Sequence, residues 1–157
     1  MPSNQNGRED LYLVFRERLF TAVVGDVLDS NGFTNQFLSE YLRPLDSSVV
    51  VIGRAFTVLE ADCTGTEIAS LNEERPFGLM LEALDSLKPF DVYICTGSRE
   101  AYALWGENMT TRAMRLGTAG AVLDGFVRDV RGILRREFPV FFARRLWARS
   151  KNSWTRY

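Results

Sequence analysis

The second half of the chain alternates between two kinds of apolar pattern, and this alternation constrains the fold more than any other feature. Short runs rich in β-branched or aromatic residues predict strands at Asp91–Thr96, Ala119–Leu123 and Phe138–Phe142. Segments with helical spacing of apolar positions lie around them, at Phe77–Leu87, Trp105–Leu116 and Arg128–Arg136. Strands and helices that alternate in this way form right-handed βαβ units. The sequence therefore predicts an α/β fold with a mainly parallel sheet.

The first half of the chain adds two helices and one strand. Glu9–Leu19 has helical periodicity, and Thr21 is expected to cap a second helix that ends at Gly32. Val49–Leu59 is predicted to be a buried strand with a close backbone approach at Gly53.

Length and composition limit the class of protein. A chain of 157 residues with 46% apolar and 25% charged residues is expected to form one globular domain. A net charge of -1 gives no general attraction to nucleic acid or anionic lipid. The sequence lacks a secretory signal pattern and an apolar run of about 18 residues that could span a membrane. We therefore expect a cytoplasmic protein without membrane association.

The absence of histidine restricts the chemistry. It excludes a Ser-His-Asp triad, a Cys-His pair and histidine-ligated metal sites. Cys63 and Cys95 do not have the spacing of a thiolate zinc site, and both are expected to act as small buried hydrophobic residues. Catalysis would have to use carboxylates, arginine, backbone amides or a bound ion.

Two short segments follow predicted strands and open predicted helices. Trp105–Met109 comes after one strand, and Asp124–Asp129 comes after the next. The carboxyl ends of parallel strands meet at one edge of a sheet, where ligands commonly bind. We therefore expect the two segments to be neighbours in space.

The chemistry of these segments suits a small anionic oxo acid bound with a divalent metal. Gly106 lets a ligand approach the backbone N–H groups at a helix start. Arg128 can bind a carboxylate through two hydrogen bonds, and Asp129 can hold a hard cation. Spacing alone also allows a structural role, in which Asp129 caps its helix, Arg128 pairs with Asp129 or Glu107, and Glu107 is only a favourable first-turn acid.

Five ordered motifs between about Thr21 and Ala143 resemble the 4-hydroxy-4-methyl-2-oxoglutarate (HMG) aldolase and RraA-like family. The motifs are Thr21–Asp29, Val51–Val58, Ala103–Asn108, Gly117–Asp129 and Phe138–Phe141. The resemblance implies a swivelling β/β/α fold and a homotrimer or hexamer. It also implies Mg²⁺- or Mn²⁺-assisted cleavage of a 4-hydroxy-2-oxo acid to pyruvate, with oxaloacetate decarboxylation as a second activity.

The resemblance also assigns roles to individual residues. Those implied to bind the pyruvyl end of the substrate are Gly106, Glu107, Asn108, Met109 and Arg128. Asp129 would bind the metal, which acts as a Lewis acid on the pyruvate enolate. Glu107 occupies the place of an acid that positions or activates a water, so the implied catalytic residues are Arg128, Glu107 and Asp129.

The chain departs from the family pattern after Ala143. Family members continue into further strands and supply an acidic residue to a neighbouring subunit, whereas residues 144–157 are basic and carry Trp147 and Trp154. We expect a domain over residues 1–143, incomplete at its C-terminus, followed by a weakly ordered tail. Basic residues interleaved with aromatic ones could also bind nucleic acid, but a frayed terminus is the favoured interpretation.

Three other functions compete with a lyase. RraA itself is a non-enzymatic regulator that binds a ribonuclease, and a truncated chain could be inactive. A methyltransferase function is disfavoured because no glycine-rich loop follows a strand. The Arg128–Asp129 pair together with Glu107 favours the enzyme, because a pure binding surface does not need to keep these groups together.

Overall fold

A computed structural model describes residues 5–60, 79–97 and 103–143. The predictions for Cys63 and for the basic tail lie outside the described residues. In this part of the chain, no helix is long and apolar enough to cross a membrane.

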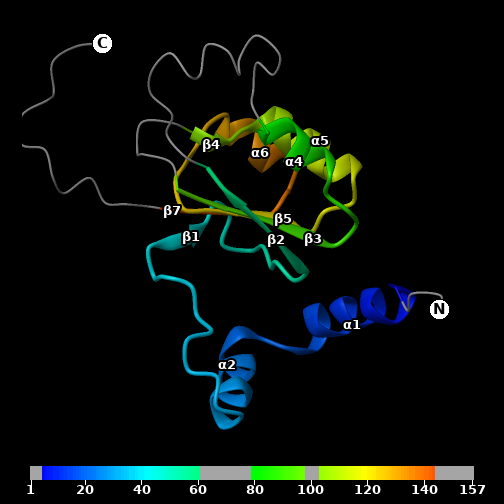
Figure 1. Cartoon of the computed structure of the whole chain (residues 1–157), viewed down its shortest axis with the longest axis vertical. Helices are drawn as coiled ribbons and strands as arrows, with labels where there is room; N and C mark the ends of the chain where they lie inside the picture. The colour runs from blue at the N-terminus through cyan, green and yellow to red at the C-terminus, as the bar shows by residue number, and fades with distance from the viewer. Residues whose placement is uncertain (1–4, 61–78, 98–102, 144–157) are drawn as a thin grey trace, which may run out of the picture.

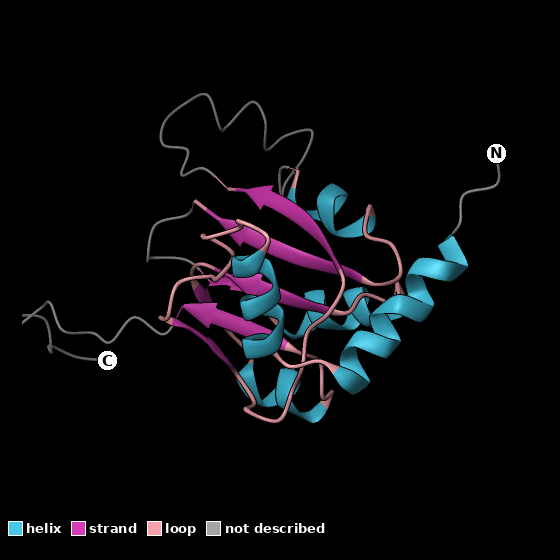
Figure 2. Ribbon diagram, turned by 90° about the horizontal axis from the view of Figure 1, so that it is seen from below, coloured by secondary structure: helices cyan, strands magenta, loops and turns pink. Residues whose placement is uncertain are grey.

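A five-stranded sheet with the order β1-β7-β5-β3-β2 forms the centre of the molecule. Four strands run parallel to one another: β2 (Arg54–Leu59), β3 (Asp91–Thr96), β5 (Gly120–Leu123) and β7 (Val140–Ala143). The edge strand β1 (Leu42–Pro44) is antiparallel to β7. Figure 2 shows the parallel strands ending at the same edge of the sheet. The predicted α/β fold with a mainly parallel sheet is confirmed.

Helices cover one face of the sheet, and a second helical pair lies on the other side (Figure 1). The covering helices are α4 (Met80–Asp85), α5 (Glu107–Arg115) and α6 (Val130–Arg135). The pair on the other side consists of α1 (Gln5–Arg18) and α2 (Thr21–Ser30). A separate two-stranded parallel sheet, β4 (Ala103–Trp105) with β6 (Phe126–Val127), lies beside the helical layer.

The core lies between the sheet and the covering helices, and Trp105 is its largest fully buried side chain. Its ring centroid lies 5.0 Å from that of Tyr93 and 6.2 Å from that of Phe138. The indole Nε1 donates a hydrogen bond of 2.8 Å to Thr110 Oγ1, so its polar atom is satisfied. Trp105 therefore fixes the end of β4 on the core, directly before the candidate site.

The local predictions for the first half are partly confirmed. Gly32 ends α2 with a φ of +85°, a left-handed conformation that favours glycine. A side chain at Gly53 would overlap the Phe90 carbonyl oxygen, so the predicted close approach is present. Thr21 is the first helical residue rather than the cap, which is Phe20.

The prediction of a buried strand over Val49–Leu59 was wrong in two respects. The strand begins at Arg54, and four of its six residues are exposed, since β2 forms an edge of the sheet. The apolar sequence pattern is typical of a central strand, but β2 lies at the edge of the sheet. Strands β1, β4 and β6 were not predicted, because strands of two or three residues are too short to show a periodicity.

Candidate active site

Pairing between β4 and β6 brings the two predicted segments together. Trp105 is in register with Val127, and the Arg128 backbone N–H donates a hydrogen bond of 2.9 Å to the Trp105 carbonyl oxygen. Both strands run in the same direction, so the residues after them emerge side by side. Gly106 and Glu107 therefore lie next to Arg128 and Asp129, as the sequence predicted.

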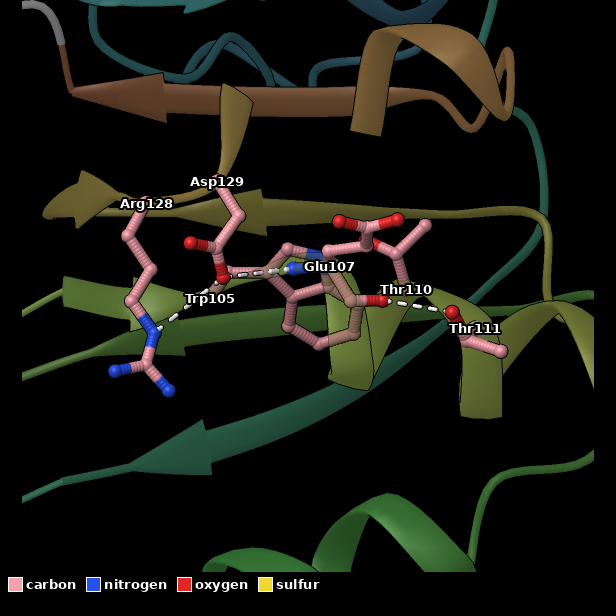
Figure 3. Close-up of polar contacts among 6 residues, drawn as sticks. All are labelled: Trp105, Glu107, Thr110, Thr111, Arg128 and Asp129. Carbon is pink, nitrogen blue, oxygen red and sulfur yellow. Dashed lines mark hydrogen bonds and ion pairs between the residues drawn. The ribbon is translucent and has the colours of Figure 1, made fainter. Parts of the chain in front are cut away.

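Gly106 is buried and allows these segments to pack closely. It is the N-cap residue of α5 and has an extended backbone, so its conformation does not require glycine. Its lack of a side chain matters because a Cβ there would lie 2.8 Å from Asp129 Oδ2 and 3.1 Å from Arg128 Nε. The Glu107 backbone N–H lies 3.4 Å from Asp129 Oδ2 and donates a hydrogen bond to it. The start of α5 thus faces the Asp129 carboxylate (Figure 3).

Arg128 and Asp129 form a loose, exposed pair. Arg128 Nε lies 3.7 Å from Asp129 Oδ2, and the two side chains are 72% and 49% exposed. An ion pair with this exposure contributes about 1 kcal/mol or less to stability. Figure 3 shows the terminal nitrogens of Arg128 directed away from Asp129. The guanidinium therefore keeps donors available for a ligand.

Asp129 has an uncommon backbone conformation. Its φ of 57° and ψ of 34° place it in the left-handed region, which Asp and Asn tolerate better than most residues. It occupies the N-cap position of α6, but its side chain makes no capping hydrogen bond. The capping role considered from the sequence is therefore wrong. A strained residue whose carboxylate does not serve its own helix is typical of a functional position.

The Glu107 carboxylate lies on the other side of Asp129 from Arg128 (Figure 3). Its Oε1 accepts a hydrogen bond of 3.0 Å from Arg136 Nη2, so the pairing with Arg128 that spacing allowed does not occur. The carboxylate packs against Gly132, where any side chain would overlap it. Sequence reasoning missed Arg136 and Gly132, although their spacing of four residues places them on one helical face.

The other two predicted binding residues have different surroundings. Asn108 is exposed in the first turn of α5. Met109 is partly buried and packs against the hydrophobic core. The structure thus places Gly106, Glu107, Arg128 and Asp129 together, whereas the Met109 side chain belongs to the core.

Asp129 is the residue of the site that could hold a divalent cation. The described residues contain no group of three or more Cys, Asp or Glu side chains that could form a protein cage for a metal. Asp129 Oδ1 makes no hydrogen bond or ion pair with another described residue. Mg²⁺ commonly binds through one or two carboxylates and keeps several waters. Asp129 is therefore a suitable single protein ligand for Mg²⁺ or Mn²⁺.

A second polar group lies at the carboxyl ends of β2 and β3. Burial raises the pKa of Glu60, and a hydrogen bond with Cys95 opposes this shift. Burial, followed by the nearby Glu60 carboxylate, raises the pKa of the Cys95 thiol to about 12. Burial also raises the pKa of Tyr93. Cys95 is 1% exposed, which confirms the predicted buried role, and its raised pKa makes it a poor nucleophile.

We expect Glu60→Gln to stabilise the fold at neutral and alkaline pH. The folded-state pKa of Glu60 is raised above its unfolded value, so its contribution to stability is present at acid pH and is lost as the pH rises through the folded-state pKa. Glutamine remains neutral and avoids this loss. Thermal unfolding at about pH 4 and about pH 8 should show a higher midpoint for the variant only at the higher pH. Glu40→Gln, at an exposed site, is the control, and an equal change in both variants would contradict the prediction.

Known proteins resemble this chain in sequence and in fold. Residues 21–155 match the model of the RraA-like family, described as Aldolase/RraA. The chain is 32% identical over 122 residues to a protein of Halalkalibacterium halodurans named "Putative 4-hydroxy-4-methyl-2-oxoglutarate aldolase", with 77% of this chain and 50% of that protein covered. The chain therefore spans about half the length of this relative.

Solved structures share the fold. A crystal structure described as one of novel cellulases from microbes of the gut ecosystem has a TM-score of 0.72 and 29% identity, covering 91% of this chain and 60% of that chain. RraAS2 of Streptomyces coelicolor, described as an unusual member of the RNase ES inhibitor RraA family, has a TM-score of 0.62 and 24% identity, covering 80% of this chain and 58% of that chain. From the family match and the relative in H. halodurans, the chain belongs to the RraA-like family.

Proposed function

We propose that the protein is a divalent-metal-dependent lyase that cleaves a 4-hydroxy-2-oxo acid, such as 4-hydroxy-4-methyl-2-oxoglutarate, to pyruvate. Oxaloacetate is proposed as a second substrate, for decarboxylation. The observation that carries the proposal is the exposed Arg128 guanidinium beside the Asp129 carboxylate at the start of α5. The name of the relative in H. halodurans supports the same reaction class.

The chain offers two groups for the pyruvyl end of such a substrate. Arg128 can donate two parallel hydrogen bonds to a carboxylate, because its terminal nitrogens are exposed. The start of α5 adds the positive end of a helix dipole next to Gly106. Together these groups would hold the carboxylate of an oxo acid beside Asp129.

Cleavage leaves negative charge on the former carbonyl oxygen of the substrate. Arg128 can stabilise that charge, since its guanidinium is exposed and its Nε lies 3.7 Å from Asp129 Oδ2. Asp129 would hold the divalent cation, which when bound supplies Lewis-acid chemistry. The protein would hold the Arg128 guanidinium and the Asp129 carboxylate close together before the substrate binds.

A coupled assay of pyruvate release tests this function. The full chain would be given a panel of 4-hydroxy-2-oxo acids and oxaloacetate, with Mg²⁺, with Mn²⁺ and with neither. Release that depends on the metal and varies among substrates would support the proposal and identify the preferred oxo acid. No release from any substrate with either metal would contradict it.

We expect Gly106→Ala to lower activity while leaving the fold intact. The new methyl group would lie 2.8 Å from Asp129 Oδ2, so the exposed Arg128 and Asp129 side chains must move apart. Misplacement of about 1 Å can lower turnover about a hundredfold, and we expect a loss of about ten- to a hundredfold in kcat/KM. Thermal unfolding should change little, because the displaced side chains are exposed. Unchanged kcat/KM would show that the close packing at Gly106 does not position Arg128 and Asp129 for activity.

A regulator that binds a ribonuclease is the second candidate, and exposed apolar side chains on the N-terminal part favour a protein contact. They include Phe20, Val27, Phe33, Phe37 and Leu38. The same surface also suits the proposed homotrimer or hexamer, and we propose a cytoplasmic location for either role. Ribonuclease binding that survives Arg128→Lys, with no lyase activity in the unmodified chain, would favour the regulator.

A further inference from the structure

We infer that Arg136 is a positioning residue for the candidate site, because it holds the Glu107 carboxylate against Gly132 and so fixes the first turn of α5 beside Asp129. The inference rests on the proposed function for its chemical meaning. Arg136 itself lies outside the Arg128–Asp129 pair and acts on it through Glu107.

Helix α6 and the residue after it form a binding site for the Glu107 carboxylate of α5. Gly132 and Arg136 are four residues apart, so they share one face of the helix. The missing side chain at Gly132 leaves a space, and the Glu107 carboxylate fills it closely enough that a Cβ would overlap Oε2 and Cδ. Arg136 Nη2 then donates a hydrogen bond of 3.0 Å to Oε1 from the end of the helix. Steric fit and charge both select one position for Glu107.

Glu107 connects this binding site at Gly132 and Arg136 to Asp129. Its side chain is anchored on α6 by Arg136, and its backbone N–H donates the 3.4 Å hydrogen bond to Asp129 Oδ2. That hydrogen bond is already long, so a small shift of the α5 start would break it. Asp129 directly precedes α6, and Arg136 directly follows it. Glu107 of α5 therefore contacts both ends of α6.

This geometry gives Glu107 a role in addition to the one that the family resemblance implied. The implied role was to position or activate a water as a catalytic acid. In the structure, the carboxylate is engaged by Arg136 and lies away from Arg128. The structure assigns the Glu107 side chain to fixing the site, while its backbone amide faces Asp129.

The neighbouring Arg135 provides a matched control. It is an exposed arginine of α6 that has no ion pair or side-chain hydrogen bond with another described residue. Arg136→Gln and Arg135→Gln remove the same charge from adjacent positions at the end of α6, but only the first releases Glu107. Arg136→Lys should rescue the function, because the contact is a single hydrogen bond that a lysine ammonium can replace.

Mn²⁺ affinity in the presence of pyruvate, measured by electron paramagnetic resonance on the full chain, tests the inference without turnover. We expect Arg136→Gln to weaken Mn²⁺ binding about tenfold. This is the lower end of the effect on metal affinity that is typical of residues that orient a metal ligand. Gly132→Ala should weaken it similarly by displacing Glu107, whereas Arg135→Gln and Arg136→Lys should stay within about twofold of the unmodified chain. Binding by Arg136→Gln that equals that of Arg135→Gln would overturn the inference.

Hydrogen exchange separates this inference from the proposed function. If the unmodified chain does not bind Mn²⁺ with pyruvate, the proposed lyase fails, but Arg136 can still position α5. Faster exchange at the amides of Glu107–Thr110 in Arg136→Gln, and not in Arg135→Gln, would then support the positioning role. Equal exchange in the two variants would reject it.

Discussion

We expect Arg128→Lys to lower kcat/KM for pyruvate release about thirty- to a thousandfold, although the charge is kept. Lysine presents a compact ammonium and cannot reproduce the planar fork that would hold a carboxylate and a carbonyl oxygen together. Loss of such a contact in the transition state corresponds to roughly 2–4 kcal/mol. Arg128 is 72% exposed, so the substitution should leave the midpoint of thermal unfolding unchanged.

Arg131→Lys is the matched control for this experiment. Arg131 is an exposed arginine on the neighbouring helix α6 and has no ion pair with another described residue. Its variant should keep full activity. A change of less than about threefold in kcat/KM for Arg128→Lys would assign Arg128 to the surface rather than to the site.

Removal of the divalent cation should abolish turnover, and Mg²⁺ or Mn²⁺ should restore it. The chain has no histidine, and Cys95 has a pKa raised to about 12. Among the described residues, the ligand that the site offers is therefore the hard carboxylate oxygen of Asp129. Excess EDTA before and after metal addition would measure the effect. Full activity of the metal-stripped protein in EDTA would exclude a metal-dependent lyase.

Asp129→Asn should reproduce the loss caused by chelation. Asparagine tolerates the left-handed backbone of this position, so the fold should remain while the anionic ligand is lost. A metal contributes several kcal/mol to charge stabilisation, so a decrease of about a hundredfold or more is expected. Asp85→Asn is the control, because Asp85 is an exposed carboxylate in a surface ion pair with Arg112. Equal activity in the two variants would contradict the role of Asp129.

The candidate site was only partly predictable from the sequence. The neighbourhood of Gly106 and Arg128 was predicted from the strands that form β3 and β5, because the carboxyl ends of parallel strands meet at one edge. The direct contact comes from the β4–β6 pair, which was not predicted. The contact between Glu107 and Arg136 did not, since it joins residues 29 apart and depends on how α5 packs against α6. The failure of Asp129 to cap α6 was equally hidden, because capping residues and left-handed Asp residues look alike in a sequence.

The sequence by itself determined the strand whose residues are mostly buried and two positions that require glycine. The predicted strand Asp91–Thr96 has the observed bounds of β3, since a strand with most of its residues buried needs a nearly continuous apolar run. Gly32 and Gly53 were also identified, because a left-handed turn and a close backbone approach both select glycine.

The tertiary structure alone decided which strands lie at the edges and which short segments pair. The apolar residues of β2 resemble those of a central strand, but only the sheet order exposes one side of it. β4 and β6 become strands because each supplies hydrogen-bond partners for the other, and neither has a pattern of its own. The physical reason is that local sequence sets backbone preference and burial periodicity, whereas long-range pairing and packing fix the positions of Arg128, Asp129 and Glu107.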